Sequence, residues 1–287
     1  MRLAARHRGA WLGLEDCGLA EVSRIPGRFG SLETVRLGSG SPIVLIPALA
    51  GGWRLMAPLA RSLALRHEVT LVGLRGDVSG IGSMATAQTP SDHAFDVAEI
   101  ISRLGLERPV IVGASFGGAV ALELALRFPQ NVGSLVITGT EAKFRPNLGS
   151  AILLRTMERL PLPRTSPFLN QFFNVLHGRR PEPGPLVDFV VDRCWETDQA
   201  VIASRLRGLE GFDLASRLWE IDVPTRVLAG SKDVVIPKAN QRALAAGIPD
   251  SSFEVLENAG HIGFLTHRAE FASQVTRFVR GRVASYC

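Results

Sequence analysis

The chain has 287 residues, of which 46% are hydrophobic and 21% are charged, a composition typical of a globular protein with a sizeable core and not of a disordered or fibrous one. The net charge of +5 comes mostly from scattered arginines, and because no basic stripe interleaved with aromatic residues is present, we expect no nucleic-acid partner. No run of about 18 apolar residues is present, so we expect no membrane span.

The cysteines and the first twenty residues bear on the compartment. Glu15 and Asp16 interrupt the apolar part of the basic N-terminal stretch, which is therefore not typical of a signal peptide. No CxxC motif or histidine-rich tract indicates a metal site. An odd number of widely spaced cysteines argues against a disulfide framework and favours a reducing compartment, so we expect a cytoplasmic protein. The three are Cys17, Cys194 and Cys287.

Short apolar runs bounded by turn residues predict the strands. Nearly continuous runs of this kind are typical of strands that are covered on both faces, as in a parallel sheet. We expect the first strand to be antiparallel to the rest. In chain order, the predicted strands are residues 31–37, 41–47, 68–74, 109–115, 134–139, 223–230 and 252–257.

Between the strands lie segments with apolar residues at the three- and four-residue spacing of a helix. Ser91 or Asp92 is the predicted N-cap of the second segment. Strands that alternate with helices predict an α/β fold with an open, doubly wound, mostly parallel sheet of about eight strands. The predicted helices are residues 53–66, 92–104, 116–128, 238–246 and 268–280.

Residues 142–218 break this alternation. They contain no clear strand, their prolines cluster, and helical patterns resume only around 186–195 and 199–209. We interpret the segment as a helical insertion on the carboxyl side of the sheet, where open α/β sheets bind ligands. The predicted core domain is therefore residues 1–141 and 219–287.

Gly113-Ala114-Ser115-Phe116-Gly117 fits the pattern G-x-S-x-G between a predicted strand and a predicted helix. A sharp turn there strains the serine backbone, and its neighbours two residues away must lack side chains to avoid collision. The alternative is a glycine-rich turn with an incidental serine. Its position favours a nucleophile, and a nucleophilic serine needs a base and an orienting acid.

Asp233 and His261 are the predicted acid and base. Asp233 lies just beyond a buried strand, and His261 lies in the loop after the last strand. Their order after Ser115 is nucleophile, acid, base. The alternatives are a turn or capping role for Asp233, with Glu141 as the reserve acid, and a structural role for His261. The other histidines lack the flanking pattern of His261, and the one nearest a pocket, His93, is expected to be solvated.

In this arrangement the chain resembles the α/β-hydrolase superfamily from about residue 32 to residue 279, with 142–218 matching the family's variable cap. The resemblance implies an oxyanion hole made by the backbone amides of Phe116 and Leu49. In the stretch that supplies Leu49, Pro47 stands where histidine is usual and Ala48 where glycine is usual.

The sequence therefore predicts a serine hydrolase that acts on a small-molecule ester, thioester or related acyl compound without a metal or organic cofactor. Two alternatives stay open: the same residues could serve C–C bond hydrolysis, acyl transfer, peracid formation or lyase chemistry, or the chain could bind a ligand without catalysis. The oligomeric state is not predicted. Aromatic residues of the insertion and its end either line the pocket or pack the cap. They are Phe168, Phe172, Phe173, Phe189, Trp195 and Trp219.

Overall fold

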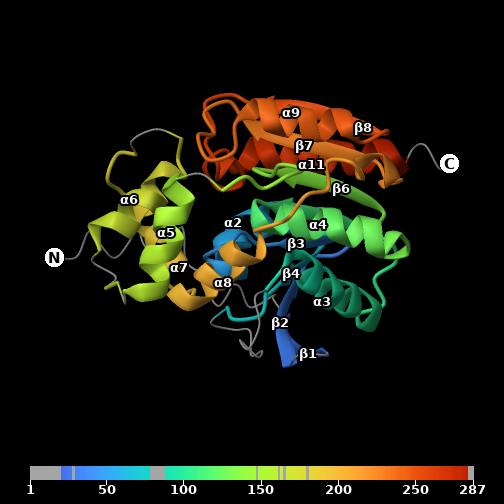
Figure 1. The fold of residues 1–287 in the computed structure, drawn as a ribbon. Helices are drawn as coiled ribbons and strands as arrows, with labels where there is room; N and C mark the ends of the chain where they lie inside the picture. Colours follow the sequence, from blue (N-terminus) through green and yellow to red (C-terminus); the bar gives the residue numbers. More distant parts are fainter. Residues whose placement is uncertain are drawn as a thin grey trace.

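In the part of the chain that the structure describes, eight strands form one sheet in the order β1-β2-β4-β3-β5-β6-β7-β8 (Figure 1). The computed structural model describes residues 21–27, 30–77, 88–146, 148–160, 162–163, 166–178 and 181–283. The N-terminal stretch and two of the three cysteines, Cys17 and Cys287, lie outside them. The strands are β1 (Glu21–Gly27), β2 (Gly30–Leu37), β3 (Pro42–Ile46), β4 (Glu68–Val72), β5 (Val110–Ala114), β6 (Ser134–Thr138), β7 (Thr225–Gly230) and β8 (Ser251–Leu256).

The strands from β3 to β8 run parallel, whereas β2 is antiparallel to β4 and β1 is antiparallel to β2. The predicted mostly parallel, doubly wound sheet is confirmed, with its antiparallel strand where the sequence places it. The sequence did not predict β1. Its residues alternate between exposed and half-buried, so this edge strand lacks the apolar run of the inner strands.

Helices cover both faces of the sheet. One face carries α2 (Gly52–Ala64), α10 (Gly263–Thr266) and α11 (Arg268–Val283), and the other carries α3 (Pro90–Arg103), α4 (Phe116–Arg127) and α9 (Lys238–Gly247).

Successive strand residues point to opposite faces. Ile43 and Leu45 of β3 therefore join the cluster under α2, whereas Val44 and Ile46 join the cluster under α4. Each such side chain stabilises the fold by about 1.5–3 kcal/mol when fully buried. Burial on both sides explains why the strand sequences are continuous apolar runs.

The start of α3 differs from the prediction. Thr89, and not Ser91 or Asp92, is the N-cap, with its hydroxyl accepting from the Asp92 amide at 3.1 Å while the Asp92 carboxylate accepts from the Thr89 amide at 3.0 Å. Pro90 fits the first helical position because it needs no N–H there. The helix therefore begins two residues earlier than residue 92.

Among the described residues between β6 and β7, in the segment predicted to be an insertion, four helices are present. Figure 1 shows them gathered at one side of the molecule. They are α5 (Leu148–Arg159), α6 (Pro167–Val175), α7 (Pro185–Cys194) and α8 (Gln199–Gly208). A short 3₁₀ turn, η4 (Leu218–Glu220), follows α8 before β7, and another, η3 (Pro129–Asn131), lies between α4 and β6. We refer to residues 142–218 as the helical segment.

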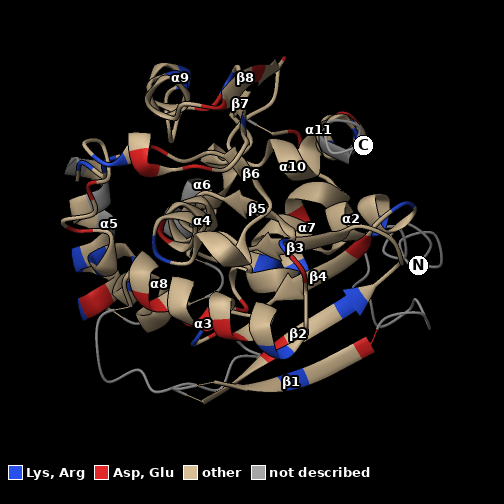
Figure 2. Ribbon diagram, turned by 90° about the vertical axis from the view of Figure 1, so that its right-hand side faces the viewer, with Lys and Arg blue, Asp and Glu red and all other residues tan. Residues whose placement is uncertain are grey.

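Charged residues of both signs are interspersed on the ribbon. Figure 2 shows both acidic and basic positions on β1 and on β2. In the part of the chain that the structure describes, no helix combines the length and the apolar character that crossing a membrane requires.

Candidate active site

Ser115 lies in a strained turn between β5 and α4. Its φ of 54° and ψ of −117° fall outside the regions that side chains favour, a strain of about 1–3 kcal/mol. Neighbouring groups hold the turn: the Ser115 amide donates to the Thr138 carbonyl oxygen at 2.8 Å, and the Thr140 hydroxyl donates to the Ser115 carbonyl oxygen at 2.8 Å. Two residues at the end of β6 thus fix the peptide groups on both sides of the serine.

The glycines around Ser115 allow the strand, the turn and the helix to touch. A Cβ on Gly113 would lie 2.7 Å from the Gly118 Cα, and one on Gly117 would lie 2.5 Å from the Pro47 carbonyl oxygen. A Cβ on Gly118 would lie 2.8 Å from the Thr140 Cβ. These separations are well below ordinary contact, so each glycine is required by the space around it. For Gly113 and Gly117 this agrees with the expectation from the sequence.

His261 bridges Ser115 and Asp233. Its Nε2 lies 2.9 Å from the serine Oγ, and its Nδ1 lies 3.0 and 3.2 Å from the two Asp233 carboxylate oxygens. An ionised carboxylate can only accept, so Nδ1 carries the proton and donates it. Nε2 is then left unprotonated and can accept from the serine hydroxyl. The imidazole and the carboxylate are both buried, which strengthens their interaction.

Asp233 is held in its ionised form. Burial alone would raise the pKa of its carboxyl group, but the imidazole of His261 and the backbone amides of Ile236 and Val235 outweigh burial, and the pKa is lowered. The two amides donate to Oδ1 at 3.0 and 2.9 Å. The carboxylate therefore stays charged at neutral pH and can stabilise a positive charge on the imidazole.

The sequence did not predict Gln241, which organises this corner of the site. The side chain is fully buried in α9, and its Nε2 donates to the Asp233 Oδ2 at 3.1 Å while its Oε1 accepts from the Gly139 amide at 2.9 Å. Gly139 itself leaves room for the imidazole, since a Cβ there would lie 2.8 Å from the His261 Cε1. A single glutamine after Pro237 carries no sequence signal for this role.

Glu141, the alternative acid, points elsewhere. Its carboxylate accepts from the Asn240 side-chain amide at 2.6 Å, and the acid in contact with His261 is Asp233.

The loop after β3, which contains Leu49, lies beside Ser115. Ile46 at the end of β3 pairs with Gly113 at the end of β5, and the small separation between Gly117 and Pro47 brings the start of α4 against this loop. Phe116 is the first residue of α4, so no carbonyl oxygen of the helix is in place to accept from its backbone amide. The helix N-terminus adds a partial positive charge at the same place.

The aromatic residues of the helical segment have different surroundings. Phe173 is buried and packs edge to face against Trp195, with ring centroids 6.0 Å apart, and the Trp195 indole donates to the Asn170 side chain at 2.9 Å. The Arg193 guanidinium lies over the Phe189 ring, with its Cζ 5.8 Å from the ring centroid. Trp219, in η4, is 70% exposed, and its indole donates to the Ser216 carbonyl oxygen at 3.0 Å. The side chains of Phe168 and Phe172 lie outside the described residues.

The expectation that His93 is solvated is wrong. Its side chain is completely buried on the inner face of α3 and packs edge to face on Phe116, with centroids 5.4 Å apart. Burial lowers the pKa of His93 well below its usual value, and the Arg205 and Arg75 guanidinium groups lower it further, so the imidazole is neutral. Within the described residues, no cluster of three or more histidine, cysteine or acidic side chains is arranged to hold a metal ion.

The fold and the site define an α/β hydrolase. Residues 41–268 match the alpha/beta hydrolase fold family, and the chain belongs to this family. The proteins similar to it include named hydrolases and esterases, and the chain is an enzyme with hydrolase activity.

Three similar proteins illustrate the kinds of hydrolase that this chain resembles. The chain is 26% identical over 258 residues to the protein named "Putative carbamate hydrolase RutD" from Rhizobium rhizogenes, covering 84% of this chain and 93% of that one. It is 28% identical over 266 residues to 2-hydroxy-6-oxononadienedioate/2-hydroxy-6-oxononatrienedioate hydrolase 2 from Pseudomonas putida, covering 85% and 90%. Among solved structures, the esterase EaEST from Exiguobacterium antarcticum superposes with a TM-score of 0.82 at 24% identity, covering 91% of this chain and all of that one.

Proposed function

We propose that this protein is a serine hydrolase that cleaves a small-molecule ester, thioester or related acyl compound, with Ser115 as nucleophile, His261 as base and Asp233 as the orienting acid. The observation that carries the proposal is the position of the His261 imidazole, which lies within hydrogen-bond distance of both the Ser115 hydroxyl and the Asp233 carboxylate. This arrangement supplies the two activating groups that a serine nucleophile needs.

In the first half of the reaction, the Ser115 Oγ attacks the carbonyl carbon of the substrate while the His261 Nε2 takes the hydroxyl proton. The carbonyl oxygen becomes an oxyanion and accepts from the amides of Phe116 and Leu49, each worth about 3 kcal/mol in the transition state. The imidazolium then gives its proton to the leaving group, and the bond between carbonyl carbon and leaving group breaks. An acyl group remains on Ser115.

In the second half, water attacks the acyl-enzyme. His261 takes a proton from the water, a second oxyanion forms in the same hole, and the proton passes to the Ser115 Oγ as the acid product leaves. Asp233 stays ionised throughout, because its role is to fix the ring and stabilise the imidazolium.

A second chemistry on the same residues has support from the relatives. One is named for hydrolysis of carbamates and another for hydrolysis of oxo-dienedioates, so the family likeness by itself does not select the scissile bond. The choice of an ester or thioester rests on the serine–histidine–aspartate chemistry, which needs no further group. Product analysis with and without an acceptor alcohol separates hydrolysis from acyl transfer.

The test is covalent labelling with a fluorophosphonate, together with hydrolysis of a series of p-nitrophenyl esters. We expect the wild-type protein to be labelled and Ser115→Ala to be unlabelled at the same thermal stability. Ser62→Ala is a matched control because this hydroxyl lies on α2, away from Ser115 in the chain, and donates to the Pro58 carbonyl oxygen of its own helix. Absence of labelling on folded wild-type protein would exclude a serine nucleophile, and labelling that survives in Ser115→Ala would place the nucleophile elsewhere.

A further inference from the structure

Two side chains of the helical segment bond to the backbone of the loop that carries Leu49. We infer that Arg205 and Thr197 are positioning residues that hold this loop in the geometry of the oxyanion hole, so that the helical segment completes the reaction centre in addition to covering it. The inference rests on the proposed function, since it assigns the Leu49 amide to the oxyanion.

Arg205 is a completely buried cation on α8 with three backbone or carboxylate partners. Its Nη1 donates to the Leu49 carbonyl oxygen at 2.9 Å, and its Nη2 donates to the Arg75 carbonyl oxygen and to the Asp77 Oδ1, both at 2.9 Å. A planar guanidinium makes such bonds in fixed directions, which a lysine ammonium cannot reproduce. One side chain therefore joins α8 to the loop after β3 and to the turn after β4.

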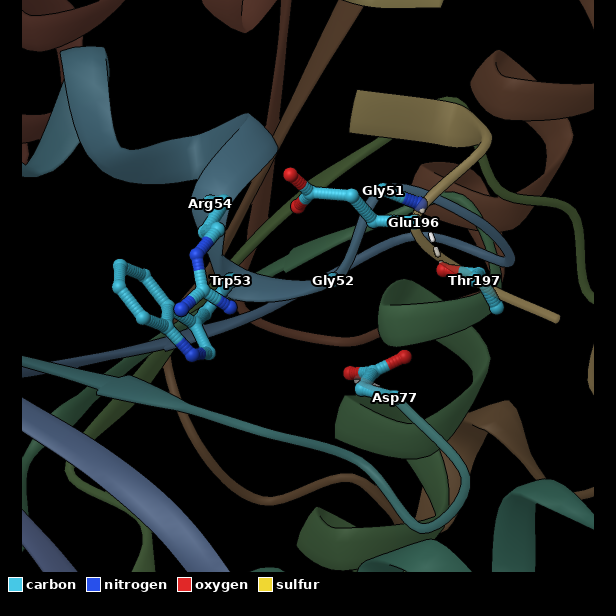
Figure 3. A pocket seen from close by; sticks show the side chains of 7 residues that line it. All are labelled: Gly51, Gly52, Trp53, Arg54, Asp77, Glu196 and Thr197. Atoms are coloured by element: carbon cyan, nitrogen blue, oxygen red, sulfur yellow. Dashed lines mark hydrogen bonds between the residues drawn. The ribbon is translucent and has the colours of Figure 1, made fainter. Parts of the chain in front are cut away.

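Thr197 makes the second connection. Its hydroxyl oxygen accepts from the Gly51 amide at 3.0 Å, a bond between residues 146 positions apart (Figure 3). Gly51 has a φ of 85° and is the N-cap residue of α2, and as a glycine it has no side chain to cap this helix. The Leu49 carbonyl and the Gly51 amide lie on either side of Ala50, so the two bonds fix the peptide groups at both ends of one short turn.

Asp77 supports Arg205 and closes the other side of the loop. Its Oδ2 accepts from the Leu74 amide at 2.9 Å, and its carboxylate lies so close to Gly52 that a Cβ there would be 3.1 Å from Oδ2. Figure 3 shows Asp77 and Thr197 facing the segment from Gly51 to Gly52 across a small hollow. The ion pair with Asp77 also compensates the buried charge of Arg205.

The loop needs support from outside because its own residues provide little. Pro47 has no amide to donate, and the backbone turns through left-handed φ values at two consecutive glycines, Gly51 and Gly52. A displacement of about 1 Å of a group at a reaction centre can lower the rate about 100-fold, so a loop held only at its ends would cost activity. The bonds from Arg205 and Thr197 prevent such a displacement.

The test compares acylation rates of four variants. Thr197→Val removes the acceptor at nearly constant volume, whereas Thr197→Ser restores it, so we expect acylation by p-nitrophenyl acetate to fall about tenfold in the first and to stay near wild type in the second. Arg205→Lys should lower acylation about 100-fold because an ammonium cannot meet all three partners. Arg207→Lys is the control, because Arg207 lies exposed on the same helix and bonds Glu158.

The readout is the split between kcat and KM, with fluorophosphonate labelling and thermal denaturation measured in parallel. A positioning role predicts a lower kcat with little change in KM. Wild-type acylation in Thr197→Val overturns the inference, and so does a raised KM at unchanged kcat, which would mean that these residues shape the substrate pocket. If Arg205→Lys does not fold, the Thr197 pair decides alone. Absence of labelling in the wild type would instead overturn the proposed function.

Discussion

Replacing Gly117 by alanine tests whether the close approach of α4 to the loop after β3 builds the oxyanion hole. The added Cβ would lie 2.5 Å from the Pro47 carbonyl oxygen and closer still to the Ile46 carbonyl oxygen, whereas ordinary contact begins at 3.4 Å. Either the helix or the loop must therefore move by about 1 Å. The backbone of Gly117 lies in the helix with an ordinary negative φ, so the perturbation is steric and not conformational.

The expected loss follows from this distance. Overpacking of a close contact costs about 1–3 kcal/mol of unfolding free energy, although alanine by itself would favour a helix by about 0.5–1 kcal/mol over glycine. Moving the Phe116 amide away from Leu49 by about 1 Å should lower kcat about 100-fold. The variant should therefore remain folded and still have a much lower kcat.

The assay is steady-state hydrolysis of p-nitrophenyl acetate, with urea denaturation of the same samples. Gly281→Ala on α11 is the matched control, because its Cβ would have no atom within 4 Å, and it should keep the wild-type kcat. A Gly117→Ala protein that keeps the wild-type kcat would refute the argument that this glycine sets the geometry of the oxyanion hole.

Three further predictions follow from individual side chains. Asp233→Asn should lower kcat about 10⁴-fold with the fold intact, because an amide does not hold the His261 tautomer, and a loss below tenfold would speak against the acid assignment. Burial raises the pKa of the Cys194 thiol to about 12, so a variant with serine at the other two cysteines should react with Ellman's reagent at pH 8 only after unfolding; rapid reaction of the folded protein would contradict the burial of this side chain. Burial also raises the pKa of Asp96 from its usual 3.8 to about 6, although the Arg75 guanidinium, whose Nε lies 2.6 Å from the Asp96 Oδ2, acts to lower it. The folded protein then holds the Asp96 proton more tightly than the unfolded chain does, which adds about 3 kcal/mol to the free energy of unfolding. This added stability is fully present below pH 3.8 and is lost as the pH rises through 6. Asp96→Asn should lack this loss in urea titrations between pH 4 and 7, and equal pH profiles of variant and wild type would contradict the raised pKa.

The sequence by itself determined the features that arise from local patterns. Continuous apolar runs such as residues 41–47 identify strands that are buried on both faces, and the glycines around Ser115 identify a strained turn, because both depend on residues close together in the chain. The positions of Asp233 and His261 were also predictable, since parallel strands bring the loops at their carboxyl ends to one edge of the sheet. The alternation of strands and helices is enough to establish that geometry.

Tertiary structure alone decided which polar residues support those loops. An arginine on an amphipathic helix is usually solvated, and Arg205 becomes buried only because α8 packs on a loop more than 150 residues earlier in the chain. Gln241 and His93 are similar cases, since each is an ordinary helical residue until a second element covers it. Burial between distant segments depends on how helices pack on the sheet, and no local pattern records that packing.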